Sequence, residues 1–377
     1  MDWETHAWRL ATGVVRPESR WYRALATTPR HLFVPRWWEN SDGLWRLRDG
    51  VSDPDAWMWA TYTDQTLVTR VGPLHADQAE PGAVLKTGSP TSSSTLPGLV
   101  VTMYRHAMIA DTSRVLVTTG TGYGTALLCR RLGDGAVTSV DVDASLVQKA
   151  DERLAAIGLR PQMVCADITG PLPEDVDRIV STVSVRPVPA SWLTALRPGG
   201  RLVTTIAGTG LILVADKTED GGAVGRITSD PAGFMRTRHG ADYEDGAREV
   251  WEKARSTDGD EVTMSRYPLL YVPDSWDVMS MLELLEPGIE HHTETAGDVR
   301  TVWMVHLDGS WARATATGFL GAPIVHQGGP RRLWDALEKI RNRLNREGTL
   351  PVYGARARVD PEGTLVLSRG KWSVTVR

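Results

Sequence analysis

The sequence predicts an α/β fold, in which a Rossmann-like, mostly parallel, doubly wound sheet is followed by an α+β C-terminal domain. Three observations predict this fold. Short apolar runs alternate with helical patterns between residues 114 and 206, as in parallel strands joined by crossover helices. A glycine-rich turn follows the first of these runs, and the regular alternation fades after about residue 208.

The length and composition bound the remaining possibilities. The 377 residues exceed one ordinary compact core, so we expect an N-terminal helical and loop region at 1–75, a nucleotide-binding core at 76–235 and an extension at 236–377. A net charge of −4 gives no overall positive field for nucleic acid. The sequence has no signal-peptide core, and no apolar run approaches the ~20 residues that cross a bilayer. We therefore expect a cytoplasmic monomer with no membrane contact.

Tryptophan is concentrated near the N-terminus, where eight of the fifteen fall within the first sixty residues. Tryptophan is rarely exposed without a binding role, so two interpretations stay open: a packing layer, or a peptide-binding groove. The two cysteines, Cys129 and Cys165, are interpreted as reduced core thiols, and their spacing predicts no metal site.

The individual elements follow from apolar periodicity and from glycine and proline positions. Residues 1–60 are interpreted as helices and loops, and residues 75–98 as a loop. The pattern then predicts strands at 114–119, 136–140, 161–166, 178–183 and 201–206, helices at 99–110, 125–132, 144–157 and 191–196, a hairpin of 211–215 with 224–228, and helices at 241–252 and 331–346.

The turn after the first strand is the strongest functional signal. Its glycines let the backbone approach a ligand, and the next helix offers free N–H groups. Asp141 ends the second strand, where a carboxylate can accept ribose hydroxyls, and Asp167 follows the third, suited to an adenine amino group. The expected nucleoside-binding residues are Thr119, Gly120, Thr121, Gly122, Tyr123, Asp141, Val142, Asp167 and Ile168.

The glycine spacing favours one nucleoside cofactor over another. The dinucleotide pattern Gly-x-Gly-x-x-Gly is not matched, because the third glycine, Gly124, comes one residue early. The turn then does not have to bind a pyrophosphate group. We therefore expect S-adenosylmethionine, with S-adenosylhomocysteine as its product, rather than NAD.

Five segments in order resemble the protein-L-isoaspartate O-methyltransferases, over roughly residues 20–209. They are Arg-His-Leu-Phe-Val-Pro at 30–35, Ala-Thr-Tyr-Thr-Asp at 60–64, Ser-Ser-Thr-Leu-Pro at 93–97, the glycine-rich motif at 115–124 and Leu-Arg-Pro-Gly-Gly-Arg-Leu-Val at 196–203. There are two departures. Thr118 stands where that family carries an acidic residue, and Thr95 aligns with the serine of its Ser-x-Pro loop.

The resemblance implies a carboxyl O-methyltransferase, with Ser93, Ser94 and Thr95 holding the substrate carboxylate and with Tyr62 and Asp64 closing this loop. A carboxylic acid ordinarily has a pKa of about 4 and is ionised at neutral pH, so it needs no general base. The histidines His31 and His106 are accordingly interpreted as structural.

The C-terminal part suggests a narrower substrate. Gly-Ser-Trp-Ala at 309–312 and Gly-Gly-Pro-Arg-Arg-Leu-Trp at 328–334 resemble the extension of a subfamily that accompanies graspetides, ribosomally made peptides cross-linked by ATP-grasp ligases. That resemblance implies methylation of an ordinary aspartate, whose ester collapses to an aspartimide. The partner would be an acidic precursor peptide.

The basic face of helix 331–346, with Arg341 and Arg343, is either a solvated surface or a contact for such a peptide. Two further functions stay open for the whole chain. One is repair of isoaspartyl damage in proteins, and the other is non-catalytic peptide binding with a vestigial cofactor pocket.

Overall fold

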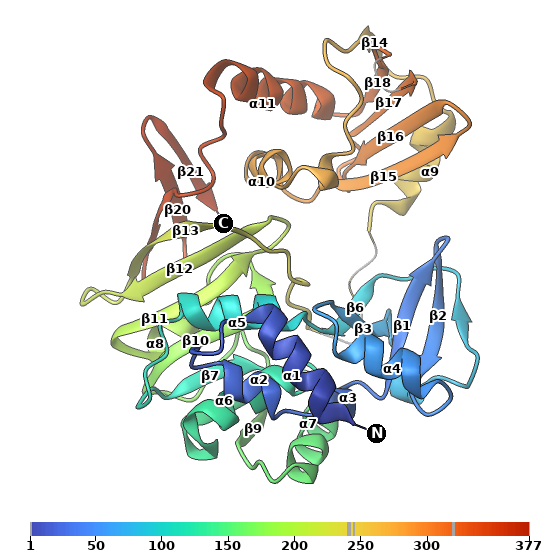
Figure 1. The fold of residues 1–377 in the computed structure, drawn as a ribbon. Coiled ribbons are helices and arrows are strands. Elements are labelled where there is room, and N and C mark those ends of the chain that lie inside the picture. Colours follow the sequence, from blue (N-terminus) through green and yellow to red (C-terminus); the bar gives the residue numbers. More distant parts are fainter. Residues whose placement is uncertain (1, 240–242, 244–245, 319–320, 377) are drawn as a thin grey trace.

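The computed structural model describes residues 2–239, 243, 246–318 and 321–376. Figure 1 shows a central sheet flanked by helices, a small N-terminal sheet beside it, and the C-terminal extension above. None of the described helices combines the length and apolar character needed to cross a membrane.

The central sheet begins with the predicted strand and helix alternation. Its parallel half has the spatial order β9-β8-β7-β10-β11. The strands are β7 (Val115–Thr118), β8 (Val137–Asp141), β9 (Gln162–Cys165), β10 (Val176–Val185) and β11 (Leu196–Ile206). The connecting helices are α5 (Pro97–His106), α6 (Tyr123–Leu132), α7 (Ala144–Ala156) and α8 (Ala190–Ala195), with 3-10 turn η2 (Asp134–Ala136). The predicted Rossmann-like α/β fold is therefore confirmed.

The same sheet continues through an antiparallel half. The predicted hairpin is confirmed as β12 (Leu211–Lys217) with β13 (Ala223–Pro231). Three strands from the end of the chain then pair in turn, first against β13. They are β19 (Arg356–Val359), β20 (Leu365–Arg369) and β21 (Trp372–Val376). The expected domain boundaries stay predictions, but residues 356–376 extend the central sheet.

Alternating side chains of the buried strands enter two cores. Val115 and Val117 pack with α1, α2, α5, α6 and α7 on one face, whereas Leu116 packs on the other with α8. The helices α1 (Trp3–Val14), α2 (Tyr22–Ala26) and α3 (Arg30–Phe33) precede the sheet in sequence. Since both faces of the parallel strands are covered, their near-continuous apolar character is explained.

The N-terminal region differs from the expected helices and loops, because it contains a sheet. Its strands are β1 (Arg36–Ser41), β2 (Leu44–Asp49), β3 (Leu67–Val71), β4 (Leu74–His75), β5 (Val84–Leu85) and β6 (Pro90–Ser94), with α4 (Pro54–Thr61) and η1 (Ala76–Gln78). Asp42 and Gly43, with φ of 54° and 75°, form the tight turn between β1 and β2. The loop prediction for 75–98 is likewise wrong at β6.

The C-terminal extension has its own antiparallel sheet, in the order β14-β18-β17-β16-β15. Its elements are α9 (Arg248–Ser256), β14 (Glu261–Met264), η3 (Val272–Asp274), α10 (Trp276–Leu285), β15 (Glu290–Ala296), β16 (Val299–Val305), β17 (Trp311–Thr317), β18 (Ile324–Gly328) and α11 (Leu333–Glu347). The helix predicted at 331–346 is confirmed as α11. Part of the helix predicted at 241–252 lies outside the described residues, and α9 begins at Arg248.

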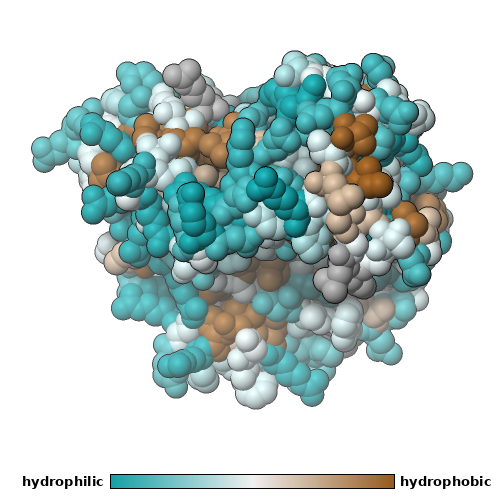
Figure 2. Space-filling view, turned by 90° about the horizontal axis from the view of Figure 1, so that it is seen from above, coloured by the Kyte–Doolittle hydropathy of each residue, from teal (hydrophilic) through white to brown (hydrophobic). Residues whose placement is uncertain are grey.

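Figure 2 views the extension from above and shows a mostly hydrophilic surface with hydrophobic residues in separate patches. Exposed apolar side chains gather on the neighbouring strands β14 and β18, at Val262, Met264 and Ile324. Of the two cysteines, Cys129 is buried as expected, but Cys165 is exposed at the end of β9, so its assignment to the core is wrong.

Candidate active site

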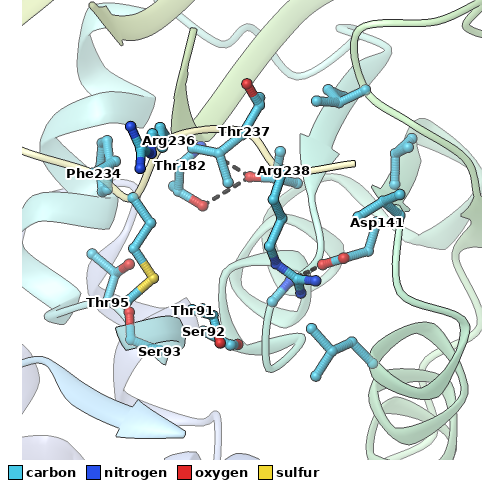
Figure 3. Close-up of a pocket in the computed structure, with 18 of the residues that line it drawn as sticks. Thr91, Ser92, Ser93, Thr95, Asp141, Thr182, Phe234, Arg236, Thr237 and Arg238 are labelled. Carbon is cyan, nitrogen blue, oxygen red and sulfur yellow. Dashed lines mark hydrogen bonds between the residues drawn. The ribbon is translucent and has the colours of Figure 1, made fainter. Parts of the chain in front are cut away.

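A cavity of about 200 Å³ lies where the parallel strands end. β7, β8 and β10 bring Thr118, Asp141 and Thr182 to its wall, and β6 adds hydroxyl side chains from the N-terminal sheet. Figure 3 shows Asp141 and Thr182 across the hollow from Ser92 and Ser93. Of the residues predicted from the sequence, the cavity brings together Ser93, Thr95, Gly120, Asp141, Val142, Asp167 and Ile168. The carboxyl edge of a parallel sheet is the usual ligand position in such folds.

The glycine-rich turn shapes one side of the cavity. Gly120 has φ of 51° and Gly122 has φ of 89°, a region that L side chains rarely adopt. A Cβ on Gly122 would also lie 3.0 Å from the Cβ of Ala150 on α7. The turn therefore requires glycine both for its backbone angles and for the close packing of α6 on α7.

Asp141 is half-buried at the end of β8 and is held by two backbone amides. The amide of Gly120 donates to Oδ2 at 3.1 Å, and the amide of Asp143 donates to Oδ1 at 3.2 Å. Burial raises the pKa of Asp141, although both hydrogen bonds act in the opposite direction. A carboxylate accepts about four hydrogen bonds, so two positions stay open toward the cavity.

Asp167, after β9, is more fully engaged. Its Oδ1 accepts from the amide and the hydroxyl of Thr169, at 2.8 and 2.7 Å, and its Oδ2 lies 2.6 Å from His239 Nδ1. Burial alone would raise the pKa of this carboxyl, but the hydrogen bonds from Thr169 and His239 lower it. Asp167 therefore stays ionised and fixed at the cavity wall.

The serine and threonine residues at β6 line two cavities. Ser93, and Thr95 just beyond the strand end, line both the main cavity and a smaller cavity of about 30 Å³, whereas Ser94 lines only the smaller one. The Oγ of Ser94 is buried without a partner among the described residues. The structure therefore places two of the three expected carboxylate-binding hydroxyls together, and adds Thr91 and Ser92 to the same wall.

Thr118 stands where the resembling family carries an acidic residue, and its hydroxyl is already hydrogen-bonded within the protein. It lies 2.8 Å from the hydroxyl of Thr182 and accepts from the amide of Thr182 at 2.9 Å. Both residues line the main cavity, and Figure 3 labels Thr182 at its wall. Thr118 thus ties β7 to β10 at the point where the two strands separate.

Three residues of the expected nucleoside set do not line the main cavity. Thr119 bonds Ser139 through its hydroxyl at 2.8 Å, and Thr121 lines only the smaller cavity. Tyr123 is buried in the core at the start of α6, where the guanidinium of Arg30 lies 5.5 Å from its ring centroid. These three residues therefore support the glycine-rich turn and do not line the main cavity.

Tyr62 and Asp64 also lie behind the cavity wall. The hydroxyl of Tyr62 is 2.7 Å from Nδ1 of the buried His31. Asp64 accepts from the amide of Gly98 at 2.7 Å, which caps the first turn of α5. Both residues thus position the segment that leads from β6 into α5.

Arg30 connects the segments that lie behind the cavity wall. Its guanidinium is fully buried and donates to five backbone carbonyls, those of Thr61, Thr63, Gln65, Ser94 and Thr95, at 2.8 to 3.3 Å. Burial lowers the pKa of Arg30 to about 10. The side chain therefore joins the end of α4 to the end of β6.

The burial of His31 predicts a pH-dependent stability. Burial lowers the pKa of His31 to about 4, below its ordinary value of 6.5, so the unfolded chain binds this proton more readily than the folded protein. The stability from keeping His31 neutral is therefore lost as the pH falls below about 6.5. We expect denaturant unfolding to show about 2 kcal/mol less stability at pH 5 than at pH 7 from this group.

The control for this prediction is His31→Gln, which cannot titrate. The difference in unfolding free energy between the two pH values should be smaller in this variant than in the unaltered protein. An equal difference in the two proteins would show that His31 does not carry the effect.

The segment 233–238 completes the cavity and was missed from the sequence. It follows β13 and runs beside the end of β10, where the amide of Ser184 donates to the carbonyl of Met235 at 2.8 Å and the amide of Thr237 donates to the carbonyl of Ser184 at 3.0 Å. Its short run Gly-Phe-Met-Arg-Thr-Arg carries no motif that points to a ligand. The pairing with β10 is long-range, so local sequence gives no signal for it.

This segment brings two arginines to the cavity. Arg238 lies beside the carboxylates at the end of β8, with its Nη2 3.6 Å from Asp143 Oδ2 (Figure 3). Arg236 lies at the opposite end, and its guanidinium is 4.8 Å from the ring centroid of Tyr243. The cavity therefore has an acidic end that is partly balanced by Arg238, and a second cation, Arg236, at its other end.

The two arginines predicted on the C-terminal helix lie away from this cavity, on α11. Arg341 donates to the carbonyl of Pro268 at 2.9 Å and lies 4.7 Å from the ring centroid of Tyr267. Arg343 pairs with Glu347, with its Nε 2.8 Å from Oε2. Both side chains are thus engaged within the extension.

The fold and the cavity together define a Rossmann-like α/β core with a ligand cavity where its parallel strands end. Residues 81–231 match the family model described as protein-L-isoaspartate(D-aspartate) O-methyltransferase (PCMT). A curated protein-L-isoaspartate O-methyltransferase of Thermotoga maritima is 30% identical over 170 residues, which are 43% of this chain and 54% of that protein. These two matches show that the central part of the chain is similar to that family, and the chain spans about half the length of the curated relative.

Two solved structures show the same similarity at lower identity. A protein-L-isoaspartate O-methyltransferase is 18% identical with a TM-score of 0.48, covering 99% of this chain and 98% of its own. A beta-aspartate methyltransferase (PCMT) of Plasmodium falciparum, in complex with S-adenosyl-L-homocysteine, is 12% identical with a TM-score of 0.43, covering 64% of this chain and 100% of its own.

Proposed function

We propose that this chain is an S-adenosylmethionine-dependent O-methyltransferase that esterifies an aspartate-type carboxylate in a peptide or protein. One observation carries the proposal: the cavity joins a nucleoside-type end at Asp141 to a hydroxyl-lined end at Ser93 and Thr95. Among the described residues that line it, there is no histidine, lysine or cysteine. A site without these bases suits a substrate that is already ionised, as a carboxylate is.

The residues present fit the proposed cofactor. The two open acceptor positions of Asp141 suit a pair of ribose hydroxyls, and the Gly120 turn leaves room for close approach of a ligand to the backbone. Val142 and Ile168 offer apolar walls on either side. When bound, S-adenosylmethionine supplies a methyl group activated by its sulfonium. The protein contributes orientation, which can account for much of a rate enhancement.

At the other end, the hydroxyls of Ser93 and Thr95 can donate to the substrate carboxylate and fix the direction of one oxygen. Neutral donors hold the carboxylate without protonating it, so its nucleophilic charge is kept. The chain segment that carries them is itself held by the Arg30 bonds to Ser94 and Thr95.

For the substrate, we propose an ordinary aspartate in a modified, graspetide-type precursor peptide. The support is the resemblance of residues 309–312 and 328–334 to the extension of that subfamily. In the resulting ester, the backbone nitrogen of the next residue attacks the ester carbonyl. A carbon–nitrogen bond forms, methoxide leaves with the amide proton as methanol, and the product is an aspartimide.

Repair of isoaspartyl residues is the second candidate, and the family match over residues 81–231 favours it. The test incubates the protein and S-adenosylmethionine separately with an isoaspartyl peptide, with its ordinary aspartyl counterpart and with a cross-linked precursor, followed by mass spectrometry. We expect a gain of one methyl group on the precursor, followed by loss of methanol. Methylation of the isoaspartyl peptide alone would favour repair, and no methylation of any probe would refute both functions.

A further inference from the structure

A second cavity, larger than the first, lies in the N-terminal sheet. Its volume is about 580 Å³, within the range of roughly 300–1,000 Å³ that is usual for ligand pockets. We call it the tryptophan groove, because Trp37, Trp38, Trp45 and Trp59 line it together with residues of α4 and of the start of β3. Nothing in the proposed methyl transfer accounts for it.

The groove exists because two neighbouring strands separate. β1 pairs with β2 at six positions but with β3 only at Trp38 and Val68. In the hairpin, alternate residues of β1 direct their backbone groups away from β2, and Asn40 is one of them. Asn40 lines the groove beyond the pair of Trp38 with Val68, where β3 pairs with β6 and not with β1, so the edge of β1 at Asn40 is open to an added chain.

The side chains around this edge suit a peptide. Trp59 is 65% exposed on the outer side of α4, although a large aromatic side chain is seldom left in water without a binding role. Glu39 and Arg48 pair with each other across β1 and β2 at the same groove, where Asp49 pairs with Arg36 and Asp53 caps α4. Aromatic surfaces with interspersed polar groups and an open strand edge recognise an extended polypeptide.

The groove lies next to the candidate active site. Thr66, which immediately precedes β3, lines both cavities, and its hydroxyl accepts from the amide of Leu96 at 3.2 Å, just before α5. A chain in the groove at Thr66 would therefore lie beside the segment that carries Ser93 and Thr95.

We propose that the tryptophan groove binds an extended segment of the peptide substrate next to the methylated residue, pairing with the open edge of β1 and placing an apolar side chain against Trp59. The part of this inference that places the substrate carboxylate at the candidate active site rests on the proposed methyltransferase function. Binding of the segment itself is independent of methyl transfer.

The kinetic test compares two precursor peptides that carry the proposed aspartate, each with S-adenosylmethionine: a short one limited to the reacting residue and its neighbours, and a long one with an apolar extended flank. Trp59→Ala should raise KM for the long peptide about tenfold and leave its kcat unchanged. KM for the short peptide should not change. Trp8→Ala is the matched control, because Trp8 is 56% exposed on α1 and does not line the groove.

A second variant fills the groove instead of emptying it. Ala56 is exposed on α4 and lines the groove. Ala56→Arg should therefore raise KM for the long peptide to a similar extent, and the protein should keep its fold. If Trp59→Ala and Ala56→Arg both leave KM for the long peptide unchanged, the groove does not bind this segment.

A binding measurement separates this inference from the proposed function. Calorimetry uses the long peptide with alanine in place of the reacting aspartate, so that this peptide cannot be methylated. Binding that is lost in Trp59→Ala supports the groove even if no peptide is ever methylated. Methylation of both peptides, with no binding of the alanine peptide to the unaltered protein, would overturn the groove and leave the methyltransferase function intact.

Discussion

Replacing Asp141 with alanine is expected to weaken S-adenosylmethionine binding about a hundredfold, because two charge-assisted hydrogen bonds of about 1.5 kcal/mol each are lost. The variant also leaves the amides of Gly120 and Asp143 without their acceptor, which loosens the turn. Calorimetric titration with S-adenosylhomocysteine measures the effect without turnover.

Asp151→Ala is the matched control for this change. Asp151 is an exposed carboxylate on α7, in the same strand and helix unit, and it does not line the cavity. Its removal should leave nucleoside affinity unchanged. If Asp141→Ala binds the nucleoside as tightly as Asp151→Ala does, the assignment of this cavity to the cofactor is wrong.

Replacing Arg30 with alanine is expected to lower the free energy of unfolding by about 3–5 kcal/mol, as for other broken buried charge networks. Five carbonyls then lose a shared donor in a region from which water is excluded. Chemical denaturation measures this loss, with Arg9→Ala on the exposed side of α1 as the control.

Arg30→Lys keeps the charge but not the planar fork of donors, so it should recover only a minor part of the stability. Where the folded variant can be isolated, its methyl-transfer rate should also fall, because the segment carrying Ser93 and Thr95 loses its anchor. Full recovery of stability by lysine would mean that the charge of Arg30 matters and its geometry does not.

The sequence predicted those parts of the site that depend on local patterns. The strand and turn at 115–124, with Asp141 and Asp167 after the next strands, could be located because each follows from a run of adjacent residues. The β1 and β2 hairpin also had a local signal, the pair Asp42 and Gly43 between tryptophan-bearing strands, and it was overlooked.

Other parts of the structure depend on contacts between distant segments. The pairing of 235–237 with Ser184 and the addition of β19 to β13 join residues far apart in the chain, so no short pattern predicts them. Arg30 was recognised only within a resembling segment, since its five acceptors come from two separate stretches. The absence of Ser94 from the main cavity could not be predicted either, because a loop assignment gives no strand register for β6.

The attachment of β19 to β13 has a consequence for dissecting the molecule. The extension leaves the central sheet after β13 and returns to it at β19, so it is anchored at both of its ends. Cutting the chain after residue 235 would remove β19, the strand that pairs with β13. The backbone groups of β13 would then be unpaired and exposed, which promotes aggregation. Separation of the two halves is therefore better attempted by closing the sheet with a short turn between β13 and β19 than by truncation.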